Sequence, residues 1–262
     1  MDDTQARATP PDEDPDETPD TVPVGVERVL ALLSQGTLDL EGLMPDSSNY
    51  TFLVRLKDEE LEGLAIYKPR RGERPLWDFP RGTLCKREAA AYTLSEALGW
   101  QLVPPTVLRD AEPHGYGSVQ LFVDADPRAH YFSLQGSFDD TFKRIAAFDI
   151  LANNADRKGG HILLGNDDRL WAIDHGITFH PEPKLRTVIW EYAGSPIPPE
   201  LLVDIAGLAT RLEDDDDPLR ATLRGLLDRN EIDALRRRTE RLLKRPQFPY
   251  PGGNRSMPWP PI

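Results

Sequence analysis

The hydrophobic pattern of the chain changes near residue 120, and this change constrains the fold more than any other feature. Before it, residues 50–57, 64–68 and 117–123 form short alternating or continuous apolar runs, which predict strands. After it, residues 138–153 have helical spacing, and further helical segments follow. The sequence therefore predicts an α+β fold, with a small β-rich first part and a mostly helical second part.

Helices and one hairpin complete the expected elements. Helical spacing or good helix formers predict helices over residues 24–33, 84–98, 138–153, 200–212, 219–227 and 231–245. The segments 162–164 and 170–173 are short apolar runs on either side of the turn sequence GNDD, so they predict a hairpin. The acidic run at 214–217 precedes a helix, where carboxylates favour the N-terminus, and we prefer this to a metal site.

The two ends of the chain have unusual composition. Residues 1–23 hold eight Asp or Glu, one Arg and almost no large apolar side chain, so we expect a disordered acidic tail. Residues 246–262 are rich in proline and are expected to form neither a regular helix nor a central strand. Phe248 and Trp259 suggest that this tail packs on the body of the protein.

Charge and cysteine content exclude several classes of protein. The formal net charge is −13, of which −7 lies in residues 1–23, and this acidic balance argues against a nucleic-acid partner. A single cysteine, Cys85, excludes an internal disulfide and is consistent with a reducing cytoplasmic location. No stretch of eighteen apolar residues predicts a transmembrane segment, and the acidic N-terminus does not resemble a signal peptide.

Four charged residues occur in the order that phosphoryl transfer requires. Such a site needs a Lys on the phosphates, a Glu holding the Lys, an Asp that orients the acceptor hydroxyl and an Asp that holds a metal ion. Lys68 ends a predicted strand and Glu88 begins the next predicted helix. Asp156 follows a helix, and Asp174 follows a strand with Gly176 allowing a tight turn.

The predicted hairpin between Asp156 and Asp174 would bring their carboxylates near each other. Two neighbouring carboxylates repel unless a cation lies between them, so a divalent ion would resolve the cost. Each element is unspecific when taken singly, because surface lysines, solvated glutamates and Asp-Arg pairs are common. The ordered set is more specific.

The chain resembles the phosphatidylinositol 3-/4-kinase-like superfamily. It is nearest in pattern to type II phosphatidylinositol 4-kinases and to an uncharacterised, mainly actinobacterial group related to them. The matching pieces cover roughly half the chain and are AIYKP (65–69), REAAAYTLSEALGW with VPPT (87–106), GSVQLFV (117–123), FDILANNADRKGG (148–160) and AIDHGITF (172–179). The resemblance implies a two-lobed protein-kinase-like fold with ATP between an N-lobe, 24–123 including the hinge, and a C-lobe, 124–245.

The resemblance also implies the role of each site residue. Lys68 would contact the phosphates of ATP and Glu88 would pair with it, while Asp156 would be the catalytic acid and Asp174 the metal ligand. The backbone of the hinge would meet adenine and comprises Gln120, Leu121, Phe122 and Val123. The loop PDSSNY lacks a GxGxxG pattern, so Ser47 and Ser48 are candidates to bind phosphate, although an ordinary hairpin turn explains them equally well.

His161 departs from the family pattern, in which the residue five positions after the catalytic Asp is an Asn that binds a second metal ion. Imidazole suits Mn²⁺ better than Mg²⁺, which prefers oxygen. His161 is therefore a candidate metal ligand, a phosphate contact when protonated, a sign of a degraded metal site, or a structural imidazole bonded to backbone. The ring of His175, the residue after Asp174, could face solvent, and we assign it no role.

The acceptor and the chemistry remain open at this level. Relatives phosphorylate inositol lipids or protein serines, and a lipid, a polyol and a protein hydroxyl are all candidate acceptors. Peripheral membrane contact stays open, and no motif bears on the oligomeric state. A pseudokinase that binds nucleotide or a partner without turnover is the alternative, and transfer of AMP to a protein is a third.

The metal preference of a His161→Asn variant tests the role of this residue. If His161 ligates the ion, the variant should keep or gain Mg²⁺-dependent activity, because asparagine supplies the oxygen that Mg²⁺ prefers. The measurement is ATP turnover with Mg²⁺ and with Mn²⁺ for both proteins. An unchanged ratio between the two metals would contradict a ligand role.

Overall fold

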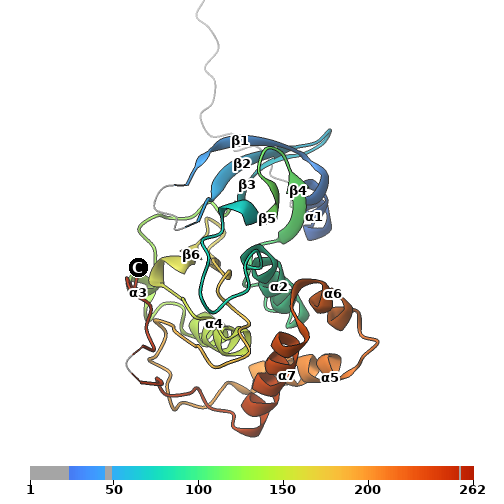
Figure 1. Ribbon diagram of the computed structural model, residues 1–262. Helices are drawn as coiled ribbons and strands as arrows, with labels where there is room; N and C mark the ends of the chain where they lie inside the picture. Colours follow the sequence, from blue (N-terminus) through green and yellow to red (C-terminus); the bar gives the residue numbers. More distant parts are fainter. Residues whose placement is uncertain (1–23, 45–48, 254) are drawn as a thin grey trace, which may run out of the picture.

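A computed structural model describes residues 24–44, 49–253 and 255–262. The elements, in chain order, are α1 Val26–Gln35, β1 Thr37–Leu43, β2 Phe52–Lys57, β3 Glu62–Pro69, the 3-10 turn η1 Arg70–Gly72, α2 Leu84–Ala97, β4 Thr106–Ala111, β5 Gly115–Leu121, α3 Tyr131–Leu134, α4 Asp139–Ala152, the 3-10 turn η2 Gly159–His161, β6 Ile162–Leu164, β7 Leu170–Ala172, α5 Pro199–Glu213, α6 Pro218–Leu226 and α7 Arg229–Lys244. Figure 1 shows β1–β5 at one end of the molecule and α4–α7 at the other, with α2 between them.

The five-stranded sheet is antiparallel and has the order β1-β2-β3-β5-β4. Strand alternation sends Ala65 and Tyr67 of β3 into a small core that also contains Leu32 and Leu33 of α1. The other face of β3 therefore carries Lys68, whose register partner on β5 is Ser118. This alternation presents the Lys68 ammonium to the interior of the molecule, toward α2.

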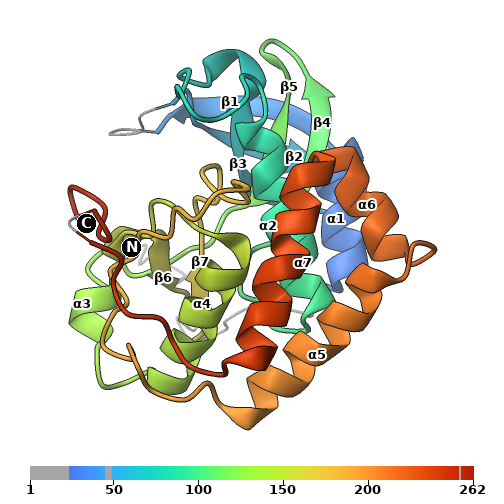
Figure 2. The same cartoon turned by 60° about the horizontal axis from the view of Figure 1, so that its bottom comes forward.

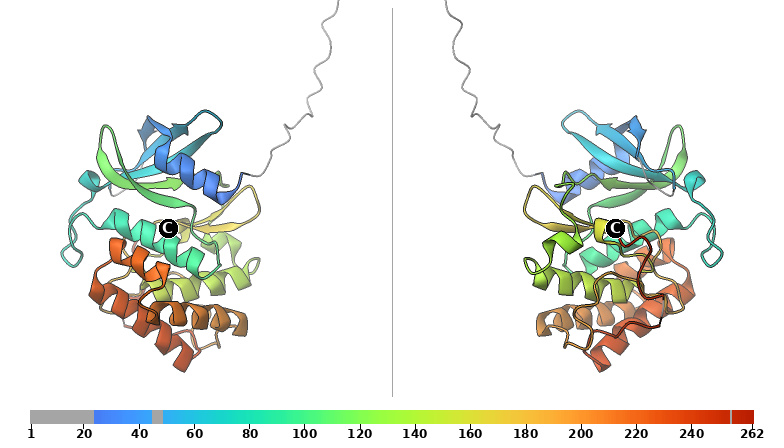
Figure 3. Two further views of the ribbon diagram at one scale, coloured as in Figure 1. Left: turned by 90° about the vertical axis from the view of Figure 1, so that its right-hand side faces the viewer. Right: turned by 90° about the vertical axis from the view of Figure 1, so that its left-hand side faces the viewer.

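A second and larger core joins the helices. Leu94 of α2, Phe148 of α4, Ile205 of α5 and Leu235 of α7 are all fully buried in it. Figure 2 shows α5, α6 and α7 packed against one another beside α2, and Figure 3 shows the sheet and the helices as separate layers from both sides. The domain division at residue 123 stays a prediction.

The β6–β7 hairpin forms where the sequence predicted it, and it links two loops. Leu163 pairs with Trp171 in the hairpin, and the amide of Ile173 donates a hydrogen bond of 3.0 Å to the carbonyl oxygen of His161. The residue that closes the β6–β7 turn in the left-handed conformation is Asp168, with φ 58°. The hairpin thereby places the residues before β6 beside those after β7.

The C-terminal residues 245–253 and 255–262 form no regular helix or strand and run back over the helical end of the molecule. Phe248 is buried, as the sequence suggested, and exchanges backbone hydrogen bonds with Gly194 and Ser195. Trp259 is 89% exposed, so the tail packs on the body through Phe248 and not through Trp259. Near the end of the segment, the carbonyl oxygen of Pro261 accepts a 2.7 Å bond from the amide of Gly159.

The structure adds elements that the pattern did not predict. The strands β1 and β4 and the short helix α3 were missed, and β5 begins at Gly115 and ends at Leu121, before the predicted limit at 123. β1 is an edge strand that is mostly exposed, so the short alternation of Leu38 and Leu40 with polar residues buries little apolar surface. The predicted tail at residues 1–23 lies outside the described residues.

A buried ion pair between α2 and α7 ties the helices together. Arg87 and Glu231 are 1% and 4% exposed, and the Arg87 guanidinium donates to the Glu231 carboxylate. Arg87 also donates a 2.5 Å bond to the carbonyl oxygen of Thr178, and its guanidinium lies 4.8 Å from the centre of the Phe79 ring. Loss of the carboxylate would leave a buried cation without its counter-ion.

Replacement of Glu231 by alanine should lower the free energy of unfolding by about 3–5 kcal/mol, because the Arg87 charge stays buried and unpaired. The matched control is Arg229→Ala on the same helix, whose side chain is 94% exposed and lies 3.9 Å from Asp233. The control should change stability by less than about 1 kcal/mol. Urea unfolding measures both, and equal losses would contradict the buried-pair argument.

Candidate functional site

Lys68 and Glu88 form a short ion pair between β3 and α2. The Lys68 Nζ lies 2.5 Å from Glu88 Oε1, and the Glu88 side chain is only 3% exposed. The second carboxylate oxygen, Oε2, accepts a 2.9 Å hydrogen bond from the amide of His175. One carboxylate therefore fixes the lysine of the sheet and the loop after β7 at the same time.

Asp174 lies on the other side of Lys68 and has a left-handed backbone, with φ 60°. Its Oδ1 is 3.1 Å from Lys68 Nζ, its Oδ2 is 3.3 Å from His161 Nε2, and half of its side chain is exposed. The Lys68 ammonium, against the opposing effect of burial, holds the pKa of Asp174 well below its usual range. Asp174, rather than Gly176, is the left-handed residue of this turn.

Lys68 keeps its charge in this setting. Burial opposes the protonated form, but Asp174 and Glu88 outweigh it and raise the pKa of the lysine above its usual value. The ammonium is thus a permanent cation held between two carboxylates, with 22% of the side chain still exposed. It can attract an anion that approaches from the exposed side of Asp174.

Asp156 has the opposite electrostatics. Burial is the largest effect on the pKa of Asp156 and raises it. The charge of Lys158 lowers this pKa, the charge of Asp174 raises it, and the resulting pKa is about 6. The Lys158 Nζ is 3.7 Å from Asp156 Oδ2, and the Asp156 amide donates a 2.9 Å bond to the side-chain oxygen of Asn154. A carboxylate with such a pKa can accept a proton near neutral pH.

A buried network below the site fixes both loops. Arg157 is fully buried, forms a 2.9 Å ion pair with Asp149 of α4, and donates a 2.8 Å bond to the carbonyl oxygen of Ile173. It also donates to Nε2 of His175 at 2.7 Å. Because that nitrogen accepts, the proton of the neutral His175 ring resides on Nδ1.

The sequence left the ring of His175 free to face solvent and assigned it no role, whereas the structure buries the ring in this network. Its exposed fraction is 0%, and burial, assisted by the charge of Arg157, holds its pKa well below the usual value. The signal that could have revealed this network is Asp149, a charged residue inside the apolar run Phe148–Leu151 of a predicted helix. A buried carboxylate demands a cation, and Arg157 is eight residues away.

His161 is mostly buried and lies beside Asp174. Burial lowers the pKa of His161 to about 4, against the opposing effect of Asp174, so the imidazole is neutral at physiological pH. This disfavours the interpretation in which a protonated His161 contacts phosphate. Its Nδ1 accepts a long, 3.4 Å contact from the Lys158 amide, and its Nε2 points to Asp174.

The donor atoms fit a divalent ion that keeps most of its coordination positions for other ligands and displaces the proton that the neutral His161 ring holds on Nε2. Two ligands about 2.1 Å from one ion lie roughly 3 Å apart, and Nε2 of His161 and Oδ2 of Asp174 are 3.3 Å apart. Within the described part of the chain, no group of three or more His, Cys, Asp or Glu forms a metal site. Phosphate oxygens and water would have to complete the coordination.

The predicted hinge is only partly free to meet a ligand. The Gln120 side chain is bonded to Thr106 at 2.8 Å, and the amides of Leu121 and Phe122 donate to Pro105 and Leu64. Among the described residues, the Val123 amide has no backbone partner. Of the backbone amides predicted to contact adenine, that of Val123 therefore stays a candidate donor. Ser47 and Ser48 lie outside the described residues.

Comparison with known proteins places the chain in a family. It is 43% identical over 269 residues to Protein Rv2133c of Mycobacterium tuberculosis (strain ATCC 25618 / H37Rv), and the match covers 88% of this chain and 94% of that protein. The chain belongs to the Rv2133c family. No protein-family model matches it.

The chain is also similar, more distantly, to part of a longer protein and to the fold of a solved structure. The chain is 31% identical over 196 residues to phosphatidylinositol 4-kinase gamma 4 of Oryza sativa subsp. japonica, and the match covers 63% of this chain and 34% of that protein. The solved structure of hydra Fam20 with sugar superimposes with a TM-score of 0.51 and 14% identity, over 84% of this chain and 87% of that chain. This member of the Rv2133c family therefore has a kinase-like fold.

The described helices include none that is long and apolar enough to cross a bilayer.

The stability of an Asp156→Asn variant should diverge from that of the natural chain as the pH rises. The folded pKa of Asp156, about 6, lies above its ordinary 3.8, so the natural chain loses stability as the pH rises from about 4 to about 6. The variant lacks this loss and should be up to about 3 kcal/mol more stable at pH 7, with little difference at pH 4. Thermal unfolding across this range measures the effect.

The matched control is Asp140→Asn, whose carboxylate is 90% exposed. Its stability curve should run parallel to that of the natural chain. A parallel curve for Asp156→Asn as well would show that the Asp156 carboxyl is not destabilised by burial.

Proposed function

We propose that the protein is an ATP-dependent phosphotransferase that moves the γ-phosphate to a hydroxyl group of an acceptor. The observation that carries the proposal is the placement of Lys68 between Glu88 and Asp174, 2.5 Å and 3.1 Å from its Nζ. A lysine held by one buried and one exposed carboxylate is poised to bind phosphate beside a metal ion. The kinase-like fold supports the same chemistry.

Each residue has a role in this proposal. Lys68 binds phosphate oxygens, and Glu88 positions Lys68 and the loop that carries Asp174. Asp156 orients the acceptor hydroxyl and takes its proton, for which the carboxylate form present above about pH 6 is required. Asp174 and His161 hold the divalent ion, Mg²⁺ or Mn²⁺, which would neutralise charge on the transferred phosphate.

The finer assignment within kinases is also a proposal. The similarity to phosphatidylinositol 4-kinase gamma 4 supports membership of the phosphatidylinositol 3-/4-kinase-like superfamily. A lipid, a polyol and a protein each offer the required hydroxyl, and Asp156 needs only a hydroxyl within hydrogen-bonding reach. The proposal is therefore stated for the reaction class, with the acceptor as the next question.

A nucleotide-binding module without turnover is the second candidate. It is favoured by His161, whose neutral imidazole replaces the asparagine oxygen of the family pattern. The direct 3.1 Å contact between Lys68 and Asp174 also lets the two charges satisfy each other without a ligand. Such a protein would bind ATP and a divalent ion but would not transfer phosphate.

ATP consumption with Mg²⁺ and with Mn²⁺ should be metal-dependent, and an Asp174→Asn variant should lose it by about 10²-fold or more, because the ion loses its anionic ligand. The control is Asp167→Asn, in the β6–β7 turn, which should keep full turnover. Incubation with candidate acceptors, followed by mass spectrometry, distinguishes phosphate from AMP adducts.

Thermal unfolding separates the two candidate functions. ATP with metal should raise the unfolding temperature of the natural chain in both cases, and only a phosphotransferase should also consume ATP. Metal-dependent stabilisation without turnover across the acceptor classes would favour the binding module. The absence of both effects would overturn the proposal that this site uses ATP.

A further inference from the structure

A large cavity lies on the helical side of the molecule, apart from the site described above. Its volume is about 840 Å³, within the range of cavities that hold small ligands. It is bounded by α7, by the segment 181–190 that follows the Asp174 loop, and by the segment 245–255 after α7. Lys68, Glu88, Asp156 and Asp174 do not line it.

The lining of this cavity is strongly basic, although the whole chain carries a net charge of −13. Its seven cationic residues are Lys184, Arg186, Arg237, Arg238, Arg241, Arg245 and Arg255. Among the described lining residues there is no aspartate or glutamate, and of the seven cations Lys184 alone has a carboxylate partner there, Asp78 at 2.8 Å. Six arginines therefore line the cavity, and none of them forms an ion pair with a carboxylate in the described part of the chain.

Arg238 shows that this arrangement is costly. Its Nε donates to the carbonyl oxygen of Leu151 at 2.7 Å and its Nη1 to that of His180 at 3.3 Å, while Nη2 is buried and has no partner among the described residues. Burial first, then the like charges of Arg237 and Arg241, lower the pKa of Arg238 to about 9. A buried guanidinium N–H without an acceptor is the group that an anionic ligand would satisfy.

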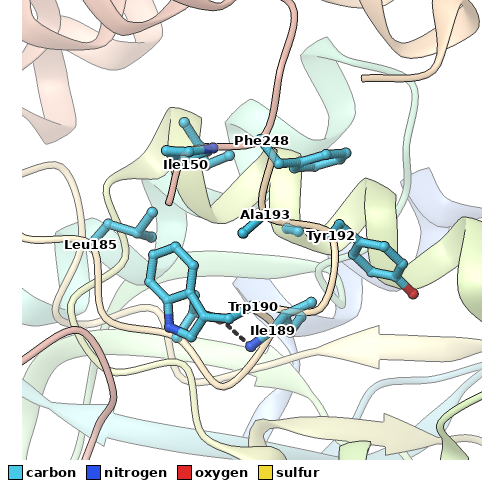
Figure 4. Close-up of a pocket in the computed structure, with 10 residues that line it drawn as sticks. Ile150, Leu185, Ile189, Trp190, Tyr192, Ala193 and Phe248 are labelled. Carbon is cyan, nitrogen blue, oxygen red and sulfur yellow. Dashed lines mark hydrogen bonds between the residues drawn. The ribbon is translucent and has the colours of Figure 1, made fainter. Parts of the chain in front are cut away.

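The cavity also has an apolar wall. Figure 4 shows Ile150, Leu185, Trp190 and Phe248 at the wall of a small pit, and these four residues also line the large cavity. The volume of the pit is about 10 Å³. The pit is no larger than one water molecule, so it is a dimple in a packed wall and does not hold a ligand of its own. The apolar wall lowers the local dielectric constant and strengthens the attraction between the guanidinium groups and an anion.

We propose that this cavity binds a small molecule that carries two or more phosphate groups. Guanidinium groups bind phosphate oxygens through paired N–H donors. Several such groups in one cavity therefore match a ligand that carries several phosphates better than a ligand that carries a single carboxylate. Arg237 and Arg241 repel Arg238, Glu231 offsets part of this repulsion, and a bound anion would relieve it further. The site is independent of ATP turnover, because it uses none of the residues assigned to phosphoryl transfer.

Calorimetric titration of the full chain with tripolyphosphate and with inositol hexakisphosphate tests the proposal. Both should bind, and an Arg237→Gln/Arg241→Gln variant should bind at least about tenfold more weakly. The matched control is Arg229→Gln/Arg236→Gln, which removes two charges from the same helix, outside the cavity lining. The control should bind as the natural chain does.

Two further arms separate the cavity from the candidate kinase site and identify the phosphate source. Inositol hexakisphosphate should still bind a Lys68→Ala variant, because Lys68 is not part of the cavity. Co-sedimentation with phosphatidylcholine vesicles that contain phosphatidic acid shows whether a lipid headgroup can supply the phosphate. Vesicle binding lost in the Arg237/Arg241 variant assigns a lipid source, and binding of the free anions alone assigns a soluble one.

Three results would overturn the proposal. One is no binding of either anion or of the vesicles. Another is equal weakening in the cavity variant and in the control, which would mean attraction to surface charge in general. The third is loss of anion binding in Lys68→Ala, which would place the anion at the candidate kinase site.

The cavity variant should unfold at the same or a higher temperature without ligand, since it has less like-charge repulsion.

Discussion

The arrangement of the candidate site depends on one buried cation, the guanidinium of Arg157. It has no exposed surface and is neutralised by Asp149 of α4, and its remaining donors reach Ile173 and His175 in the loop after β7. The loop with Asp156 and the loop with Asp174 are therefore tied to one helix by one side chain. Such a pair is specific in geometry, because a buried charge moved from its partner carries a large desolvation penalty.

Above this network, Asp174 and Asp156 lie in different environments, which shift their pKa values in opposite directions. Asp174 has a cation beside it and stays ionised, whereas Asp156 is buried with weaker compensation and has its pKa raised to about 6. Two carboxylates in one site with opposite shifts are suited to different tasks, one to hold a cation and one to move a proton. Glu88 connects this pair to the sheet, since it binds both Lys68 and the His175 amide.

The electrostatics of the whole molecule divide in a similar way. The chain is acidic, yet seven cationic residues line one cavity between α7, the segment 181–190 and the residues that follow α7. The segment that lines the cavity also touches the loop of the candidate site, because the amide of Arg186 donates to Asn154 and the amide of Arg157 donates to Arg186. This backbone pairing joins the lining of the cavity to the loop that carries Asp156.

The sequence by itself determined the order of the main elements and the residues that can do chemistry. Apolar runs and their spacing placed β2, β3, α4 and the β6–β7 hairpin, and good helix formers placed α2. The pattern missed β1 and β4: β1 is an edge strand with little buried surface, and the burial of β4 follows from its neighbours. The order Lys68, Glu88, Asp156, Asp174 was visible because it depends on residue type and spacing.

Only the tertiary structure decided which charges meet and which are hidden. His175 is buried because Arg157 and Phe148 close over it from other elements, and Trp259 is exposed although its residue type favours burial. The basic cavity collects residues from three separate segments between 150 and 255, so no local pattern could predict it. Burial and charge pairing are sums over neighbours distant in sequence, and a sequence pattern records only neighbours along the chain.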